Sequence, residues 1–162
     1  MLPIRTILHP TDFSESSDQA FQMACALARD YGASLVVLHV YPLPIAHGEV
    51  VARRQENGYH DELWQKLRSY ECQNLATAVI LRLEEGDPAK EILRAASEVQ
   101  CDLIVVGTHG RTGVGRLLMG SVAEQVIRKA PCPVLAVKIR LAMVEAASQK
   151  AAAATAATPA TS

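Results

Sequence analysis

The sequence predicts an α/β protein with an open, doubly wound sheet of five parallel strands and helices on both faces. Short apolar runs alternate five times with amphipathic helical segments along the 162 residues, and this alternation is typical of parallel sheets with right-handed crossovers. The runs at residues 35–40 and 103–106 are apolar almost throughout, as in strands covered on both faces. A chain of this length can form one domain with a full two-sided core.

The first strand is predicted at residues 4–8, ending at Pro10 and the turn that follows. Ser14 then caps a helix, and Gly32 ends it at a position where a left-handed backbone is usual. The apolar stripe of this helix, at helical spacing, contains Ala20, Ala24, Leu27, Ala28 and Tyr31.

The second strand is the run at residues 35–40, ended by Pro42 and Pro44. The polar stretch at residues 53–58 precedes a clearer helix, in which Trp64 and Leu67 are expected to pack on the sheet. One side of that helix carries Tyr59, Leu63, Leu67 and Tyr70. A third strand follows at residues 79–84, where alternating residues predict one wetter face.

The second half of the domain begins at Asp87 and Pro88, an N-cap acid followed by a proline at the first helical position. The strand at residues 103–106 leads into a long loop and a helix that runs to Ala130. The last strand is predicted at residues 134–137.

The sequence changes character after the last strand, so we expect a domain at residues 1–141 and a tail at residues 142–162. Residues 142–150 are compatible with a short extension of helix. The rest is alanine-rich and of low complexity. Such a segment buries too little surface to order itself, and disorder is expected.

Composition excludes several classes of protein. A formal net charge of −1 argues against nucleic-acid binding driven by bulk charge. No apolar run approaches the roughly 20 residues that span a bilayer, and no membrane partner is expected. The four cysteines are widely spaced without a CxxC pair, which predicts buried thiols. Residues 1–3 lead directly toward a strand without the features of a secretory leader, so the expected location is the reducing cytoplasm.

The stretch at residues 107–121 predicts an anion site. It contains five glycines, which allow the backbone to turn its N–H groups toward one point because glycine enters positive φ cheaply. The helix that follows adds unpaired N–H groups and the positive end of its dipole. Arg111 and Arg116 add positive charge, and no acid lies between Asp102 and Glu124. A phosphate is the simplest ligand for such a site.

Simpler explanations exist for parts of this stretch. Glycines after a strand often only form a turn, and Ser121 with Glu124 has the pattern of a capping box. However, a plain strand-to-helix connection needs only about 2–6 residues, and this one is longer and basic. It is not a Walker A loop, because no lysine precedes Ser121.

The spacing Gly107-x2-Gly110-x9-Gly120-Ser121 resembles the nucleotide-binding motif of the universal stress protein family, in its ATP-binding subgroup. Further segments are similar to that family, over a stretch from about residue 4 to residue 139. They are residues 7–14, 38–40, 86–88, 101–106 and 131–137. The resemblance implies the strand order 3-2-1-4-5. In sheets of this kind a ligand binds beyond the carboxyl ends of the strands where the order reverses, which is here between the first and fourth strands.

The resemblance implies an adenine nucleotide (ATP, AMP or ADP, with or without Mg²⁺) as the ligand. Asp12 would contact ribose hydroxyls or the nucleotide's metal ion, although a plain turn role is the alternative. Pro10, Thr11 and Val40 would line an apolar slot for the base, although Val40 can equally be core. His39 is interpreted as a hydrogen-bonded core histidine. The expected phosphate contacts are Gly107, His109, Gly110, Arg111, Arg116, Gly120, Ser121 and Val122.

The sequence contains no catalytic triad and no evident base that could activate water at a γ-phosphate, so no catalytic residue is assigned. We expect a regulatory module of the stress response that holds a nucleotide with slow or absent turnover. The alternatives are a slow ATP hydrolase or phosphotransferase that uses the same site, and a nucleotide-free dimerisation or partner-binding module.

A homodimer is expected through the last strand, Val134, Leu135, Ala136 and Val137. In the implied order this strand lies at a sheet edge, and its apolar residues carry no charge until Lys138. An unprotected apolar edge favours pairing with another strand. The alternative is that the alanine-rich tail covers the edge.

Overall fold

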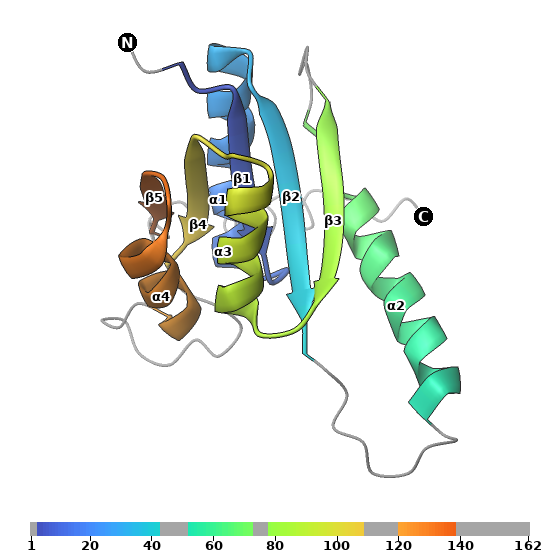
Figure 1. Cartoon of the computed structure of the whole chain (residues 1–162). Helices are drawn as coiled ribbons and strands as arrows, with labels where there is room; N and C mark the ends of the chain where they lie inside the picture. The colour runs from blue at the N-terminus through green and yellow to red at the C-terminus, as the bar shows by residue number, and fades with distance from the viewer. Residues whose placement is uncertain (1–2, 43–51, 73–77, 109–119, 139–162) are drawn as a thin grey trace, which may run out of the picture.

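The computed structural model describes residues 3–42, 52–72, 78–108 and 120–138, and it confirms the predicted fold class. Five parallel strands form one sheet in the order β3-β2-β1-β4-β5 (Figure 1). The order that the family resemblance implied is therefore confirmed. The elements are β1 (Thr6–Thr11), α1 (Glu15–Tyr31), β2 (Ser34–Tyr41), α2 (Ala52–Arg68), β3 (Val79–Glu85), α3 (Pro88–Glu98), β4 (Leu103–Gly107), α4 (Ser121–Lys129) and β5 (Val134–Val137).

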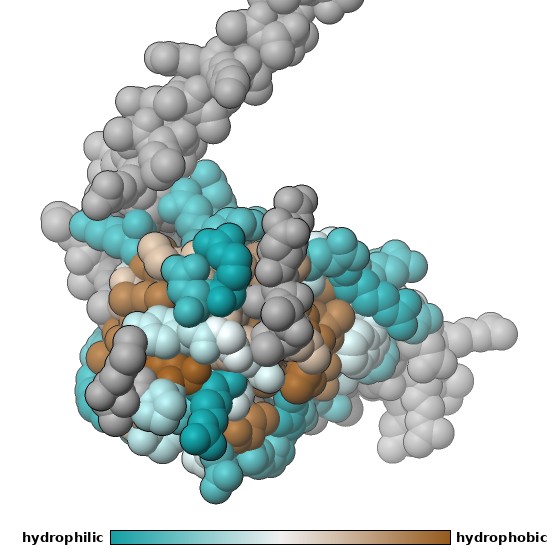
Figure 2. Space-filling model, turned by 90° about the horizontal axis from the view of Figure 1, so that it is seen from above, coloured by the Kyte–Doolittle hydropathy of each residue, from teal (hydrophilic) through white to brown (hydrophobic). Residues whose placement is uncertain are grey.

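Helices cover both faces of the sheet and create two cores. α3 and α4 lie on one face and α1 on the other (Figure 1). Ile7 and Leu8, neighbours in β1, belong to different cores because successive strand residues point to opposite faces. The end of the molecule where the strands begin faces the viewer in Figure 2, and hydrophobic residues there are interrupted by hydrophilic ones.

α1 begins and ends where the sequence predicts. The Ser14 hydroxyl accepts from the Ser17 N–H at 3.3 Å, and Gly32 has φ of 65°. Small residues form the buried stripe, which lets the helix lie close to the sheet: Ala20, Ala24 and Ala28. The expectation that Tyr31 is buried is wrong, since its side chain is 46% exposed at the helix end, and Phe21 is buried instead.

β1 is longer than the sequence predicts, because it continues through Pro10 to Thr11. Pro10 pairs with Leu38 in the register of β2. The N–H of Ser34 donates to the carbonyl of Arg5 at 2.8 Å, and the alternation of a parallel ladder therefore directs the nitrogen of Pro10 away from β2. The missing N–H thus removes no bond from that ladder.

α2 also differs from the prediction, because it begins at Ala52 and includes the polar stretch at residues 53–58. Arginine, glutamine and glutamate favour helix without providing an apolar period, so the pattern of hydrophobic residues did not indicate this part. Leu63 and Leu67 are buried and Trp64 packs against the same core as expected, whereas Tyr59 is 46% exposed.

β3 and α3 follow the sequence-based prediction. Ile80 in β3 is exposed, while its neighbours are partly buried on the other face. The Asp87 carboxylate caps α3 by accepting from the Lys90 N–H at 2.9 Å, and Pro88 occupies the first turn.

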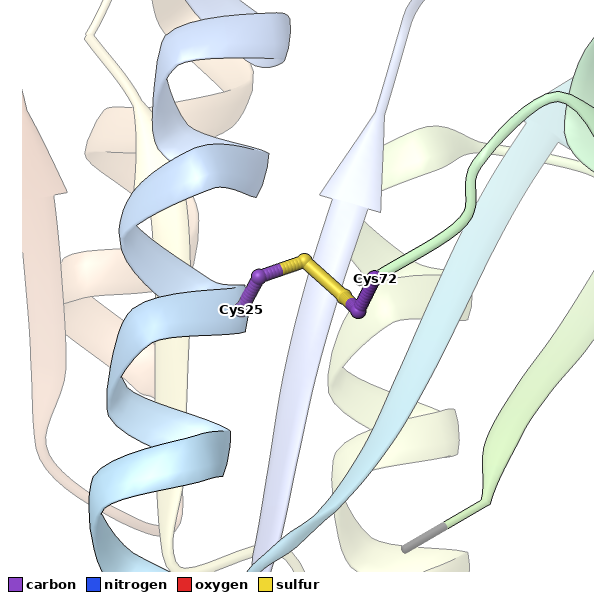
Figure 3. Close-up of a disulfide and its surroundings, with 2 residues drawn as sticks. All are labelled: Cys25 and Cys72. Atoms are coloured by element: carbon purple, nitrogen blue, oxygen red, sulfur yellow. A yellow bond between two sulfur atoms is a disulfide. The ribbon is translucent and has the colours of Figure 1, made fainter. Parts of the chain in front are cut away.

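The structure contradicts the prediction of buried thiols at Cys25 and Cys72, whereas Cys101 is a buried free thiol as predicted. Cys25 of α1 and Cys72, which follows α2, form a disulfide (Figure 3). Cys101 and Cys132 are free thiols. Cys25 and Cys72 lie 47 positions apart in the sequence, so their spacing did not reveal the bond; the fold brings them together by placing the segment after α2 against α1.

None of the helices in the described ranges is long and apolar enough to cross a membrane.

Candidate functional site

A cavity of about 300 Å³ lies at the carboxyl ends of the central strands. It opens where the strand order reverses between β1 and β4, the position at which open α/β sheets bind ligands. Residues from β1, β2, β4, α1, α3 and α4 and the loops beside them line it. They are Pro10, Thr11, Asp12, Ser17, Leu38, Val40, Pro88, Ile92, Val106, Gly107, Thr108, Gly120, Ser121, Val122 and Ala123.

The fold brings most of the predicted site residues together around this cavity. Those that line it are Pro10, Thr11, Asp12, Val40, Gly107, Gly120, Ser121 and Val122. The remaining four, His109, Gly110, Arg111 and Arg116, lie outside the described residues.

The walls of the cavity are largely aliphatic. Leu38 and Val106 are buried core residues whose side chains also reach the cavity, and Val40 packs against the same core. Val40 thus packs against the core and also lines the cavity. Ile92 and Pro88 of α3 contribute a further wall. An aliphatic slot of this kind suits a flat apolar ring.

The N-terminus of α4 forms the polar end of the cavity. The Glu124 N–H donates to the Gly120 carbonyl at 3.0 Å, which is the first bond of the helix. Helix geometry leaves the N–H groups of Ser121, Val122 and Ala123 without an acceptor inside the helix, and all three residues line the cavity. The Gly120 N–H donates to the Thr108 carbonyl at 2.8 Å and so joins the helix start to the end of β4.

The alternative explanation of Ser121 and Glu124 as a capping box is wrong. Ser121 is the first residue of the helix rather than its N-cap, and Gly120, which holds that position, provides no side-chain bond. The Glu124 carboxylate instead pairs with Arg128 one turn later, at 2.5 Å. No side chain of Gly120 or of the first turn of α4 therefore caps the N–H groups at the helix start.

Neither glycine at the ends of the predicted loop is required there by a positive φ. Gly120 has φ of −58°, and Gly107 is absent from the glycines with positive φ, which are Gly32 and Gly86 among the described residues. A Cβ on Gly107 would lie 2.7 Å from the Ser16 Oγ and 2.9 Å from the Ser16 carbonyl. Gly107 is therefore required for the close packing of α1 on β4.

Asp12 takes part in the turn between β1 and α1. Its Oδ1 accepts from the Ser14 N–H at 3.1 Å and from the Ser14 hydroxyl at 2.5 Å. The turn role weighed from the sequence is therefore real. The carboxylate also lines the cavity, so the turn fixes an acid at the rim of the site.

A chain of hydrogen bonds supports the site from behind. The Tyr70 hydroxyl donates to the Asp18 carboxylate at 2.7 Å, and its oxygen accepts from the Thr11 hydroxyl at 2.8 Å. The Thr11 oxygen in turn accepts from the Ser17 hydroxyl at 2.8 Å and the Phe13 N–H at 3.0 Å. These bonds join the end of β1 to α1 and to the segment after α2.

Two buried histidines complete this support. His9 is fully buried, and its Nδ1–H donates to the Val105 carbonyl across β1 and β4 at 2.9 Å. Burial lowers the pKa of His9 to about 4, so the ring is neutral at pH 7. His39 donates from Nδ1 to the Thr11 carbonyl at 2.7 Å, which confirms the prediction of a hydrogen-bonded core histidine. Neither histidine lines the cavity.

Sequence reasoning missed several residues of the site. Ser17, Leu38, Pro88, Ile92, Val106, Thr108 and Ala123 line the cavity. The topology could have indicated them, because the strand ends and the first turns of the helices meet where the strand order reverses. Nothing local indicated that Tyr70 reaches Thr11, since they lie 59 positions apart.

The described residues contain no group of three or more metal-ligating side chains. The aliphatic walls and the N–H groups at the start of α4 suit an elongated ligand with an apolar ring at one end and an anionic group at the other.

Comparisons with known proteins agree with this fold. The sequence pattern of the universal stress protein family matches residues 3–138. A universal stress protein of Thermus aquaticus is 38% identical over 144 residues, covering 83% of this chain and 98% of that protein. The structure of protein MJ0577 of Methanocaldococcus jannaschii has a TM-score of 0.79 and 30% identity, covering 86% of this chain and 99% of its own. A universal stress protein in complex with cAMP has a TM-score of 0.66 and 28% identity, covering 84% and 98%. This chain thus belongs to the universal stress protein family.

Proposed function

We propose that this protein binds an adenine nucleotide, ATP, ADP or AMP, as a regulatory module of the stress response. One observation carries the proposal: an aliphatic slot and the N-terminus of a helix meet in a single cavity at the reversal of strand order. The base would occupy the slot beside Val40, and the phosphates would lie at Ser121 and Val122. The related structure in complex with cAMP, itself an adenine nucleotide, supports this choice of ligand.

Residues 109–119 would complete the phosphate site. His109, Arg111 and Arg116 carry the donors and positive charge that a polyphosphate needs. The first turn of α4 offers N–H groups and the positive end of its dipole. Gly110 and Gly120 would allow phosphate to approach the backbone.

Asp12 would accept hydrogen bonds from ribose hydroxyls, or would contact a Mg²⁺ ion that arrives on the nucleotide. The fit to a metal is limited to one carboxylate, whose Oδ1 already accepts two bonds from Ser14. A Mg²⁺ ion here would take its other ligands from phosphate and water.

The experiment that tests this function is mass spectrometry of small molecules released from protein purified without added nucleotide. We expect an adenine nucleotide in a fixed ratio to the chain. If the released fraction contains none, and added ATP, ADP and AMP all fail to bind, the nucleotide-free alternative is correct.

Turnover is expected to be slow, because Asp12 is the only carboxylate that lines the cavity among the described residues, and its Oδ1 already accepts two hydrogen bonds from Ser14. A slow ATP hydrolase or phosphotransferase remains the competing function for the same site. A steady-state rate in the ordinary range of roughly 1–10³ per second, lost in Asp12→Ala, would favour that enzyme over the regulatory module.

We also propose a homodimer through β5. This strand pairs with β4 on one side only within the described part of the chain. Leu135 is 37% exposed, and Ile127 on neighbouring α4 is 41% exposed. A twofold axis perpendicular to β5 would pair this strand antiparallel with its copy and cover these side chains.

A further inference from the structure

The four cysteines form two spatial pairs, although no two are close in the sequence. Cys25 and Cys72 are bonded, with Cα atoms 5.7 Å apart. Cys101 and Cys132 are 31 positions apart, yet their free Sγ atoms lie 3.2 Å from each other. This second pair has no part in the cavity or in the hydrogen-bond chain behind it.

The backbone holds both thiols in place from neighbouring strands. Cys101 lies just before β4, and its N–H donates to the Ala96 carbonyl of α3 at 3.0 Å. Cys132 lies just before β5. The Ile104 N–H of β4 donates to the carbonyl of adjacent Pro133 at 3.0 Å. The two sulfur atoms are therefore brought together by regular sheet pairing and a helix end.

We propose that Cys101 and Cys132 are a redox-active dithiol, a modification site that a low-molecular-weight disulfide such as oxidised glutathione converts to an intramolecular disulfide. The contact between the two sulfur atoms needs only a small approach to become a bond. The site is separate from the cavity, because it lies where β4 and β5 begin, at the opposite end of the sheet.

The reaction proceeds in two exchanges. The Cys132 thiolate attacks one sulfur of oxidised glutathione, forms a mixed disulfide and releases one glutathione. The Cys101 sulfur, after losing its proton, then attacks the Cys132 sulfur and releases the second glutathione. The protein loses two electrons and two protons, and one glutathione disulfide is reduced to two thiols.

Exposure sets the order of these exchanges. Cys132 is partly exposed, whereas Cys101 is buried. Burial, together with the neighbouring Cys132 sulfur, raises the pKa of the Cys101 thiol well above its usual range. Cys101 is thus shielded from an external oxidant and reacts only with the sulfur beside it.

The new bond would close a ring that contains β4, the predicted phosphate loop at residues 107–121 and α4. Closing a ring of this length restricts the unfolded chain, which should raise Tm by about 10 °C relative to the same protein with this pair reduced.

Peptide mapping of the full chain tests the proposal. The reduced protein is treated with oxidised glutathione in EDTA, its remaining thiols are blocked with N-ethylmaleimide, and it is digested with trypsin without reductant. Trypsin releases the two cysteines on separate peptides, 95–111 and 130–138. We expect these peptides to be joined, with a mass two hydrogens below their sum. A product that carries only glutathione adducts, or that joins either peptide to those of Cys25 or Cys72, would overturn the proposal.

Single variants test the order of reaction. Cys101→Ser should accumulate one glutathione on Cys132, because the second thiol is missing. Cys132→Ser should keep Cys101 unmodified. The reverse pattern would contradict the proposed order of the two exchanges. Whether the disulfide forms at all is decided by the peptide map of the wild type, without either variant.

Discussion

Gly107 at the end of β4 lies directly against Ser16 in the first turn of α1, with no room between them for a side chain. A Cβ at Gly107 would approach the Ser16 Oγ to 2.7 Å and its backbone carbonyl to 2.9 Å. Because Ser16 is itself buried and its backbone cannot move aside cheaply, this contact sets how closely α1 packs on the sheet beside the cavity. Gly107, which the motif assigns to ligand binding, is therefore also required for the packing of α1 on the sheet.

Gly107→Ala should consequently destabilise the fold by about 1–3 kcal/mol, as overpacking of a tight contact does. Urea denaturation measures this loss. Gly58→Ala, at an exposed position of α2, is the matched control. Nothing lies within 4 Å of its added Cβ, and the helix should gain about 0.5–1 kcal/mol. Equal stability of the two variants would contradict the close approach of Ser16.

Tyr70→Phe should lower the free energy of unfolding by about 1–3 kcal/mol, because the hydroxyl bonds both Thr11 and Asp18. The same change at exposed Tyr59 should stay within about 0.5 kcal/mol. Chemical denaturation of both variants provides the comparison. A Tyr70→Phe variant as stable as wild type would show that this bond chain does not hold the segment after α2.

Acid should destabilise the protein through His9. Its pKa in the folded state, about 4, lies below the 6.5 of an ordinary histidine, so between these pH values the unfolded chain binds a proton that the folded protein does not. The stability is present above pH 6.5 and is lost progressively as the pH falls toward 4, by up to about 3 kcal/mol. In His9→Gln this part of the pH dependence should disappear. An unchanged slope between pH 6.5 and 4 in that variant would exclude His9 as its source.

Ala136→Pro tests the proposed dimer without breaking the sheet. Pro133 and Val137 carbonyls accept from β4, and the alternation of a parallel ladder therefore directs the Ala136 N–H to the open edge. Removing that donor should shift a dimer toward monomer in light scattering. Ala136→Ser, which keeps the N–H, should remain dimeric. A monomeric wild type, or a Pro variant that stays fully dimeric, would disprove pairing through β5.

The fold was predictable to a large extent because its signals are local. Apolar runs, the Ser14 and Asp87 caps and the Gly32 terminus all act within a few residues. No local signal indicates the strand order, which was predicted from the family resemblance. The start of α2 was missed because its polar residues show no apolar period.

The lining of the cavity was predictable where residues lie at the carboxyl ends of strands, as Thr11 and Gly107 do. The features that were not predicted depend on contacts between distant segments. They are the Cys25–Cys72 bond, the Tyr70–Thr11 bond and the packing of Gly107 on Ser16. Sequence spacing alone cannot reveal such neighbours.

Calorimetric titration of ATP into wild type and Gly120→Val tests the central proposal most directly. The backbone of Gly120, with φ of −58° and ψ of 143°, is open to valine, so the variant should fold while its branched side chain blocks phosphate from the start of α4. Gly58→Val, remote in α2, is the control for substitution itself. The account predicts saturable binding of one nucleotide per chain in wild type and control, and none in Gly120→Val. Equal affinity in all three proteins would contradict the assignment of the phosphate site to this helix.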